Sequence, residues 1–199
     1  MKSLVRFIVC SAIALLVLES SVLAQVPSFG ICPRVTVAVA DDFDVVRYMG
    51  RWYEQDKYPF IIQFGGKCAT AIYALRDDGI VSVVNRQIDR FDETENIANG
   101  TAILESPGKL IVNFAPVPIP GQPSNYWILD TDYDSYAVVF SCVQIVPGFI
   151  YTTNAWVLTR ARNPPQTLLR TAYDVFDRNN ISLSFLLRTD QLNCDRDDE

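Results

Sequence analysis

The side chains that could do chemistry in this chain are hydroxyls, amides and aromatic rings, not the usual catalytic groups. There is no histidine among the 199 residues, which removes the commonest general base, the commonest zinc ligand and every triad that contains histidine. Cys68, at the start of a predicted strand, is the one candidate nucleophile, but it is more useful as half of a disulfide. No inward pair of carboxylates is evident. We therefore expect no enzymatic activity, no cofactor and no metal site.

The cysteines indicate an oxidising compartment. Cys10 belongs to an N-terminal leader, and an even number of cysteines remains: Cys32, Cys68, Cys142 and Cys194. Their spacing contains no Cys-x-x-Cys pair, so neither a zinc knuckle nor a thioredoxin-like redox centre is expected. The sequence predicts two disulfides, and three pairings are possible.

The first 24 residues read as a secretory signal peptide. Lys2 and Arg6 precede an apolar run from Phe7 to Leu18, and Ala24 supplies the small residue that signal peptidase needs. A membrane span is the weaker interpretation, because the run has about twelve residues and a span needs roughly twenty. We expect cleavage after Ala24, a single domain over residues 25–199, and secretion to the extracellular space.

The overall charge argues against some partners. The formal net charge is −6, and lysine and arginine are scattered along the chain instead of clustered. No basic face is expected, so nucleic acid and anionic membrane surfaces are poor candidates for partners.

The elements that must position these side chains are mostly strands. Between residues 50 and 160 the apolar residues recur with a period of two, with β-branched and aromatic enrichment and turn signals between the runs. The predicted strands lie near residues 50–57, 68–76, 80–89, 98–105, 109–115, 125–130, 136–145 and 150–160. Short connections favour an antiparallel up-and-down meander, and eight such strands can close into a barrel without an exposed edge. The predicted fold class is all-β, and a barrel of this size has room for one small ligand.

The period changes after the last of these strands. Asn163 is the predicted cap of a helix, Pro164 and Pro165 suit its first turn, and apolar residues from Leu168 to Phe176 fall on one stripe. This single amphipathic helix is expected to pack on the outside of the barrel. The alternating run 181–185 predicts a short final strand beside it.

Three motifs in this order resemble the signature regions of the lipocalin family: Gly50-Arg51-Trp52-Tyr53-Glu54, Thr131-Asp132-Tyr133, and Arg160. The surrounding residues are similar to the apolipoprotein D group of that family and its arthropod bilin-binding relatives. The resemblance runs from about Cys32 to Cys194. It implies a barrel closed at one end and open at the other, with a helix outside. It also implies that Cys32 pairs with Cys142 and Cys68 with Cys194.

The motif residues are expected to build the closed end and to touch no ligand. Trp52 would plug the narrow end, with the guanidinium of Arg160 over its indole face. Gly50 would allow a close approach of the chain, and Asp132, next to Thr131, would accept hydrogen bonds from the backbone of a turn.

The open end is expected to carry the ligand. Strand alternation and the resemblance together place eight side chains inside the barrel: Tyr73, Asn85, Gln87, Val112, Phe114, Tyr126, Trp156 and Leu158. They would form an aromatic, mostly uncharged cup whose hydroxyls and amides orient a ligand. The plainer alternative is that these aromatic residues simply fill the interior.

The expected function is transport of a small hydrophobic ligand in extracellular fluid by a monomer. The resemblance implies fatty acids, steroids, retinoids or bilins, and the absence of histidine makes a bilin or other pigment the second choice. A third hypothesis is a protein-binding module that acts through the open-end loops. The apolar segments 58–62, 117–120 and 147–150 would form a rim that either folds inward as a lid or contacts a lipid or lipoprotein surface. Asn99 and Asn180 begin patterns for N-linked glycosylation.

Overall fold

The computed structural model describes residues 26–39, 41–60, 63–114 and 123–194. The predicted signal peptide and the apolar segment 117–120 lie outside these ranges. The strands are β1 Val26–Phe29, β2 Gly50–Lys57, β3 Gly66–Leu75, β4 Val81–Asp89, β5 Glu95–Ser106, β6 Lys109–Asn113, β7 Ser124–Thr131, β8 Tyr136–Val146, β9 Ile150–Thr159 and β10 Leu187–Arg188. The helical elements are α2 Val45–Tyr48, α3 Gln166–Arg178 and the 3-10 turn η3 Leu183–Phe185.

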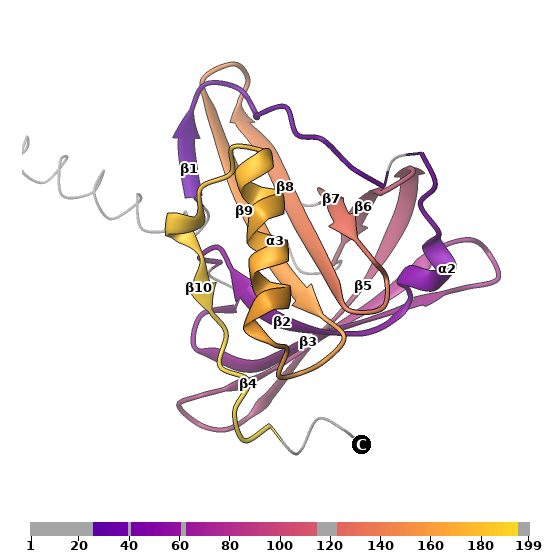
Figure 1. Ribbon diagram of the computed structural model, residues 1–199, viewed down its shortest axis with the longest axis vertical. Coiled ribbons are helices and arrows are strands. Elements are labelled where there is room, and N and C mark those ends of the chain that lie inside the picture. Colours follow the sequence, from indigo (N-terminus) through magenta and orange to yellow (C-terminus); the bar gives the residue numbers. More distant parts are fainter. Residues whose placement is uncertain (1–25, 40, 61–62, 115–122, 195–199) are drawn as a thin grey trace, which may run out of the picture.

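The strands from β2 to β9 form a closed barrel (Figure 1). Each pairs antiparallel with the next, and β9 also pairs with β2, where Tyr53 lies opposite Thr159. The ladder therefore returns on itself, and the predicted eight-stranded antiparallel up-and-down barrel is confirmed. Two short strands extend the sheet at the closing seam, because β1 pairs with β9 and β10 pairs with β2.

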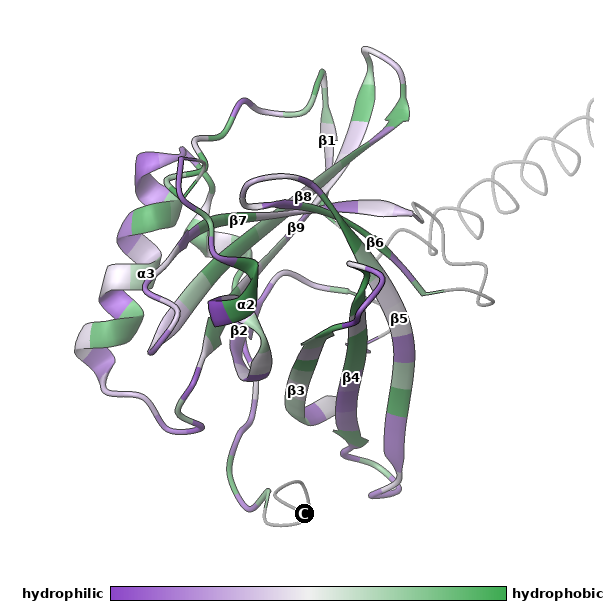
Figure 2. Ribbon diagram, turned by 90° about the vertical axis from the view of Figure 1, so that its right-hand side faces the viewer, coloured by the Kyte–Doolittle hydropathy of each residue, from purple (hydrophilic) through white to green (hydrophobic). Residues whose placement is uncertain are grey.

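Helix α3 packs on the outside of the barrel, against β8 (Figure 1). Apolar and polar residues alternate around it (Figure 2), and its buried side chains are Leu169, Ala172, Val175 and Phe176. The predicted helix is confirmed, but its predicted start is wrong. The residue before the first turn is Pro165, in an extended conformation and with no side-chain cap. Pro164 precedes another proline and is therefore pushed out of the helical region, so it cannot be the first helical residue and Asn163 cannot be the cap.

Three other local features differ from the expectation. The segment 181–185 is not a strand: the Ser182 hydroxyl accepts a hydrogen bond from the backbone N–H of Ser184 and starts η3, and the final strand is β10. Helix α2 has only four residues, too few for a periodic pattern, and is capped by the Asp44 carboxylate. Strand β1 exists through its pairing with β9, which no local pattern reveals.

Both disulfides implied by the resemblance are present. Cys32 is bonded to Cys142, which ties the N-terminal segment to β8, and Cys68 is bonded to Cys194, which ties the C-terminal segment to β3. Within the described ranges, none of the helices has the length and apolar character needed to cross a membrane.

Candidate functional site

The first motif closes the barrel floor. Trp52 is fully buried, its indole N–H donates to the carbonyl of Tyr48 at 2.9 Å, and its ring lies 5.2 Å from that of Tyr48. The guanidinium carbon of Arg160 lies 3.7 Å from the centroid of the same indole. A desolvated cation-π pair of this kind contributes on the order of 2 kcal/mol. The expected stacking of Arg160 on Trp52 is confirmed.

The Arg160 guanidinium also joins separate parts of the chain. It donates to the carbonyls of Tyr133, Arg51 and Met49 at 2.9, 2.8 and 2.7 Å. Gly50 makes room for it: its φ is +94°, and a Cβ built there would lie 3.2 Å from the guanidinium. Each of the three guanidinium nitrogens therefore donates to a backbone carbonyl, as a structural role requires.

The second motif builds the turn between β7 and β8. One carboxylate oxygen of Asp132 accepts from the backbone N–H groups of Asp134, Ser135 and Tyr136, and the Ser135 hydroxyl donates to the other. Partial burial acts to raise the pKa of Asp132, but these hydrogen bonds outweigh it and hold the pKa below its usual value. The Thr131 hydroxyl accepts from the N–H of Tyr133. This turn fixes the β7–β8 register next to the floor.

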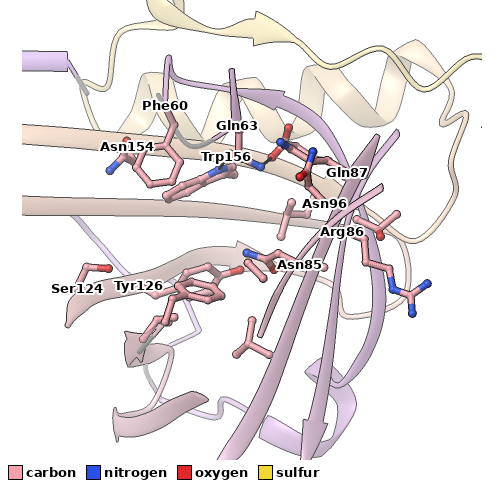
Figure 3. Close-up of a pocket in the computed structure, with 18 of the residues that line it drawn as sticks. Phe60, Gln63, Asn85, Arg86, Gln87, Asn96, Ser124, Tyr126, Asn154 and Trp156 are labelled. Carbon is pink, nitrogen blue, oxygen red and sulfur yellow. Dashed lines mark hydrogen bonds between the residues drawn. The ribbon is translucent and has the colours of Figure 1, made fainter. Parts of the chain in front are cut away.

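Above the floor lies a cavity of about 410 Å³. All eight side chains expected inside the barrel line it: Tyr73, Asn85, Gln87, Val112, Phe114, Tyr126, Trp156 and Leu158. Figure 3 shows Tyr126, Asn85 and Trp156 around the opening between the strands. Gly100 makes space for one of them, because a Cβ at this position would lie 2.6 Å from the ring of Phe114. The interior is therefore not filled by its own side chains, contrary to the plainer alternative.

Other lining residues were not predicted. Val83 lies on the same face of β4 as Asn85, and Asn154 lies on the same face of β9 as Trp156. Simple alternation would have found both. Phe60 and Gln63 come from the β2–β3 loop, where no periodicity applies. The Phe60 ring meets Trp156 edge-on at 6.5 Å, and the indole N–H of Trp156 points to the amide oxygen of Gln63 at 3.5 Å.

Three tyrosine hydroxyls meet at the bottom of the cavity. The Tyr126 hydroxyl lies 3.0 Å from that of Tyr48 and 2.9 Å from that of Tyr73. Burial raises the pKa of Tyr73 to about 12 and raises those of Tyr48 and Tyr126 well above their ordinary value. All three are therefore neutral at physiological pH. Tyr48 comes from α2, which explains why the strand pattern did not predict this cluster.

A buried charge pair borders the cavity. Glu54, which lines it, is 2.9 Å from the ammonium of Lys57 and accepts hydrogen bonds from Gln63 at 2.8 Å and Thr189 at 2.6 Å. Because both charges are removed from water, each depends on the other. Thr189 follows β10, so the C-terminal segment helps to hold this wall in place.

The predicted apolar rim is only partly present. Tyr58 is buried, not exposed, and its hydroxyl donates to the carbonyl of Ser182, so its assignment to the rim is wrong. Phe60 faces into the cavity. Phe149, at the tip of the β8–β9 hairpin, is 71% exposed and lies next to Phe29 and Ile31, which are 92% and 70% exposed.

Comparisons with known proteins agree with this architecture. A family model for a lipocalin-like domain matches residues 43–186. Apolipoprotein D of Cavia porcellus is 38% identical over 187 residues, which cover 92% of this chain and 94% of that protein. The chain is a lipocalin. The Lazarillo protein of Schistocerca americana is 35% identical to this lipocalin over 185 residues, covering 89% and 82% of the two chains.

Solved structures share the same barrel. Lobster apocrustacyanin A1 has a TM-score of 0.71 at 20% identity, covering 85% of this lipocalin and 92% of that chain. Insecticyanin of Manduca sexta has a TM-score of 0.69 at 23% identity, covering 83% and 89%. Family membership and the apolipoprotein D relatives make this lipocalin a binding protein for small hydrophobic ligands and not an enzyme.

Proposed function

We propose that this lipocalin carries a small hydrophobic ligand in extracellular fluid, in the cavity lined by the eight inward side chains named above. The candidates are a steroid, a retinoid, a fatty acid or a similar lipid. The observation that carries the proposal is an aromatic cavity of about 410 Å³ with hydrogen-bonding groups at its floor. This volume and composition are typical of small-molecule sites. Binding would gain roughly 25 cal/mol for each Å² of apolar area removed from water.

The tyrosine cluster gives the ligand an orientation. Tyr48, Tyr126 and Tyr73 have three O–H groups but only two contacts between them, so one proton has no acceptor within the cluster. A spare proton on Tyr48 would be buried away from the cavity, whereas Tyr73 and Tyr126 line it. The favourable arrangements therefore present one O–H donor to the ligand. The deep end of the ligand would be an acceptor such as a carbonyl or ether oxygen.

The charges near the floor favour a neutral acceptor over a carboxylate. Burial is the main cause of the raised pKa of Tyr73, the hydrogen bond with Tyr126 lowers that pKa, and the negative charge of Glu54 raises it, so a negative charge is already present there. Lys57 is paired with Glu54. A fatty acid would place its carboxylate at the mouth instead. A bilin or carotenoid remains the second candidate, and it would be recognised by its colour.

The test is native mass spectrometry of the secreted protein, followed by organic extraction and a visible spectrum. A stoichiometric colourless lipid is the expected result. An absorption band in the visible spectrum would instead identify the ligand as a bilin or carotenoid. Extraction of no ligand, together with recovery of one stoichiometric protein partner in a pull-down, would favour a protein-binding module instead.

Secretion is proposed with cleavage after Ala24, and two disulfides suit an oxidising compartment. Asn99 on β5 and Asn180 after α3 are both exposed, as glycan acceptors must be. Peptide mass spectrometry with and without glycosidase would establish the mature N-terminus and the occupancy of both sites. We propose a monomer, which sedimentation would test.

The exposed tip formed by Phe29, Ile31 and Phe149 is proposed to contact a lipid surface during loading. The inward Phe60 is the part of the rim that acts as a lid. Liposome flotation of the ligand-free protein tests this contact. Recovery of the protein entirely in the bottom fraction would contradict the lipid contact and leave the lid as the role of the apolar rim.

A further inference from the structure

The inner face of β8 and β9 carries three polar side chains beside the cavity, and of these Asn154 lines it. Ser141 on β8 lies directly opposite Asn154 on β9, and Thr152 is on the same face of β9, two residues earlier. Because Asn154 lines the cavity, this face is the inner one. The three residues are 2%, 6% and 1% exposed, so they are removed from bulk water.

These side chains have unsatisfied hydrogen-bonding capacity. Neither the hydroxyl oxygens of Ser141 and Thr152 nor the amide oxygen of Asn154 has a hydrogen-bond partner in the part of the chain that the structure describes. Buried polar atoms are normally paired, because an unpaired one carries the full cost of its desolvation. The polar group of a ligand or a trapped water would supply that partner.

The wall lies at the opposite end of the aromatic stretch from the tyrosine cluster. Trp156 stacks on Tyr126 with 6.4 Å between ring centroids, and Asn154 is two residues from Trp156 toward the open end. A flat apolar body lying on Trp156 would thus have an O–H donor at its deep end and the Ser141, Thr152 and Asn154 side chains at its outer end.

We propose that Ser141, Thr152 and Asn154 form a second polar subsite that binds a hydroxyl group of the ligand. This rests on the proposed function and narrows it to a lipid with an acceptor oxygen at one end and a hydroxyl at the other. A hydroxyl both donates and accepts, so it can satisfy the Asn154 oxygen and the two hydroxyls together. A carboxylate only accepts.

The basic side chain that could bind an anionic group of a ligand does not lie on this wall. Arg86 is the only arginine or lysine among the described residues that line the cavity, and its guanidinium bonds to Glu95. Figure 3 shows Arg86 on the other side of the opening from Asn154, with its guanidinium directed away. The wall is therefore suited to a neutral polar group.

The experiment compares two steroid probes that differ by one hydroxyl: 17β-hydroxy-5α-androstan-3-one and 5α-androstan-3-one. Both are titrated by displacement of the fluorescent probe N-phenyl-1-naphthylamine. A purely apolar cavity would prefer the second steroid, because it is the more hydrophobic. The wild type should instead bind the hydroxy-ketone about tenfold more tightly, the effect of one added hydrogen bond.

The double variant Thr152→Val with Asn154→Leu should lose or reverse this preference. Thr153→Val is the matched control, because Thr153 is the intervening residue and points to the other face; it should keep the preference. Thr152→Val alone should leave the Tm unchanged or raise it, because no hydrogen bond within the protein is lost.

The proposal is overturned if the wild type shows no preference for the hydroxy-ketone, which would mean that water alone occupies the wall. It is also overturned if the double variant keeps the preference, or if Thr152→Val lowers the Tm by several degrees. Failure of the wild type to bind the fluorescent probe and both steroids would be a different result, because it would contradict the carrier function itself.

Discussion

Replacing Trp156 by alanine should separate ligand binding from folding, because this indole forms cavity wall and not barrel floor. It is only partly buried, and it touches Phe60 and Tyr126, which also line the cavity. A ligand lying on one face of the ring would cover roughly 80 Å² of the 150–250 Å² that a tryptophan side chain can bury. Losing that contact costs about 2 kcal/mol at 25 cal/mol per Å². The expected Kd is therefore about thirtyfold weaker.

The matched control is Trp52→Ala. This indole is fully buried below the cavity, under the guanidinium of Arg160, and its N–H bonds to Tyr48. Its removal should lower the free energy of unfolding by about 3–5 kcal/mol, the range for large-to-small changes of aromatic residues in cores. Two measurements on each variant suffice: urea unfolding, and titration with N-phenyl-1-naphthylamine under conditions where the variant is folded. The reverse pattern, with Trp156→Ala unfolding and Trp52→Ala binding poorly, would refute the assignment of floor and mouth.

The other predictions concern pH and cross-links. Burial raises the pKa of Tyr73 to about 12, so the folded state holds a proton that an unfolded tyrosine loses near pH 10. The free energy of unfolding should therefore fall as the pH rises through this interval. A free energy that does not change with pH there would contradict the buried cluster. Tyr126→Phe should cost about 1–3 kcal/mol by leaving its two partner hydroxyls unpaired, and denaturant unfolding at neutral pH measures it. Asp132 has a lowered pKa, so its stabilising effect is present above the ordinary carboxyl pKa of 3.8 and is lost as the pH falls through the pKa of the folded state. Asp132→Asn should therefore reduce the loss of stability at acid pH. An unchanged loss would show that the turn carboxylate is unimportant. Replacing both Cys32 and Cys142 by alanine should cost about 2–5 kcal/mol while the barrel circular dichroism persists below the new Tm.

Local patterns in the sequence determined the strands and the long helix. The barrel strands alternate apolar and polar residues because one face meets the interior and the other meets solvent or α3, and this period of two is visible without any partner strand. The same alternation, together with the family motifs, placed Tyr73, Asn85 and Trp156 on the inner face. The number of cysteines outside the leader was enough to predict two disulfides, although the pairing came from the family resemblance.

Features that depend on a distant partner were decided only by the tertiary structure. Strands β1 and β10 exist because β9 and β2 offer them backbone groups, and their own sequences are too short to show a period. The tyrosine cluster needs Tyr48 from α2 to reach across to β3 and β7, and the polar wall becomes visible only when β8 and β9 are in register. Hydrophobic periodicity reports which way a side chain points relative to its own element. Whether a polar group finds a partner depends on which other elements surround it, and that is fixed when the barrel closes.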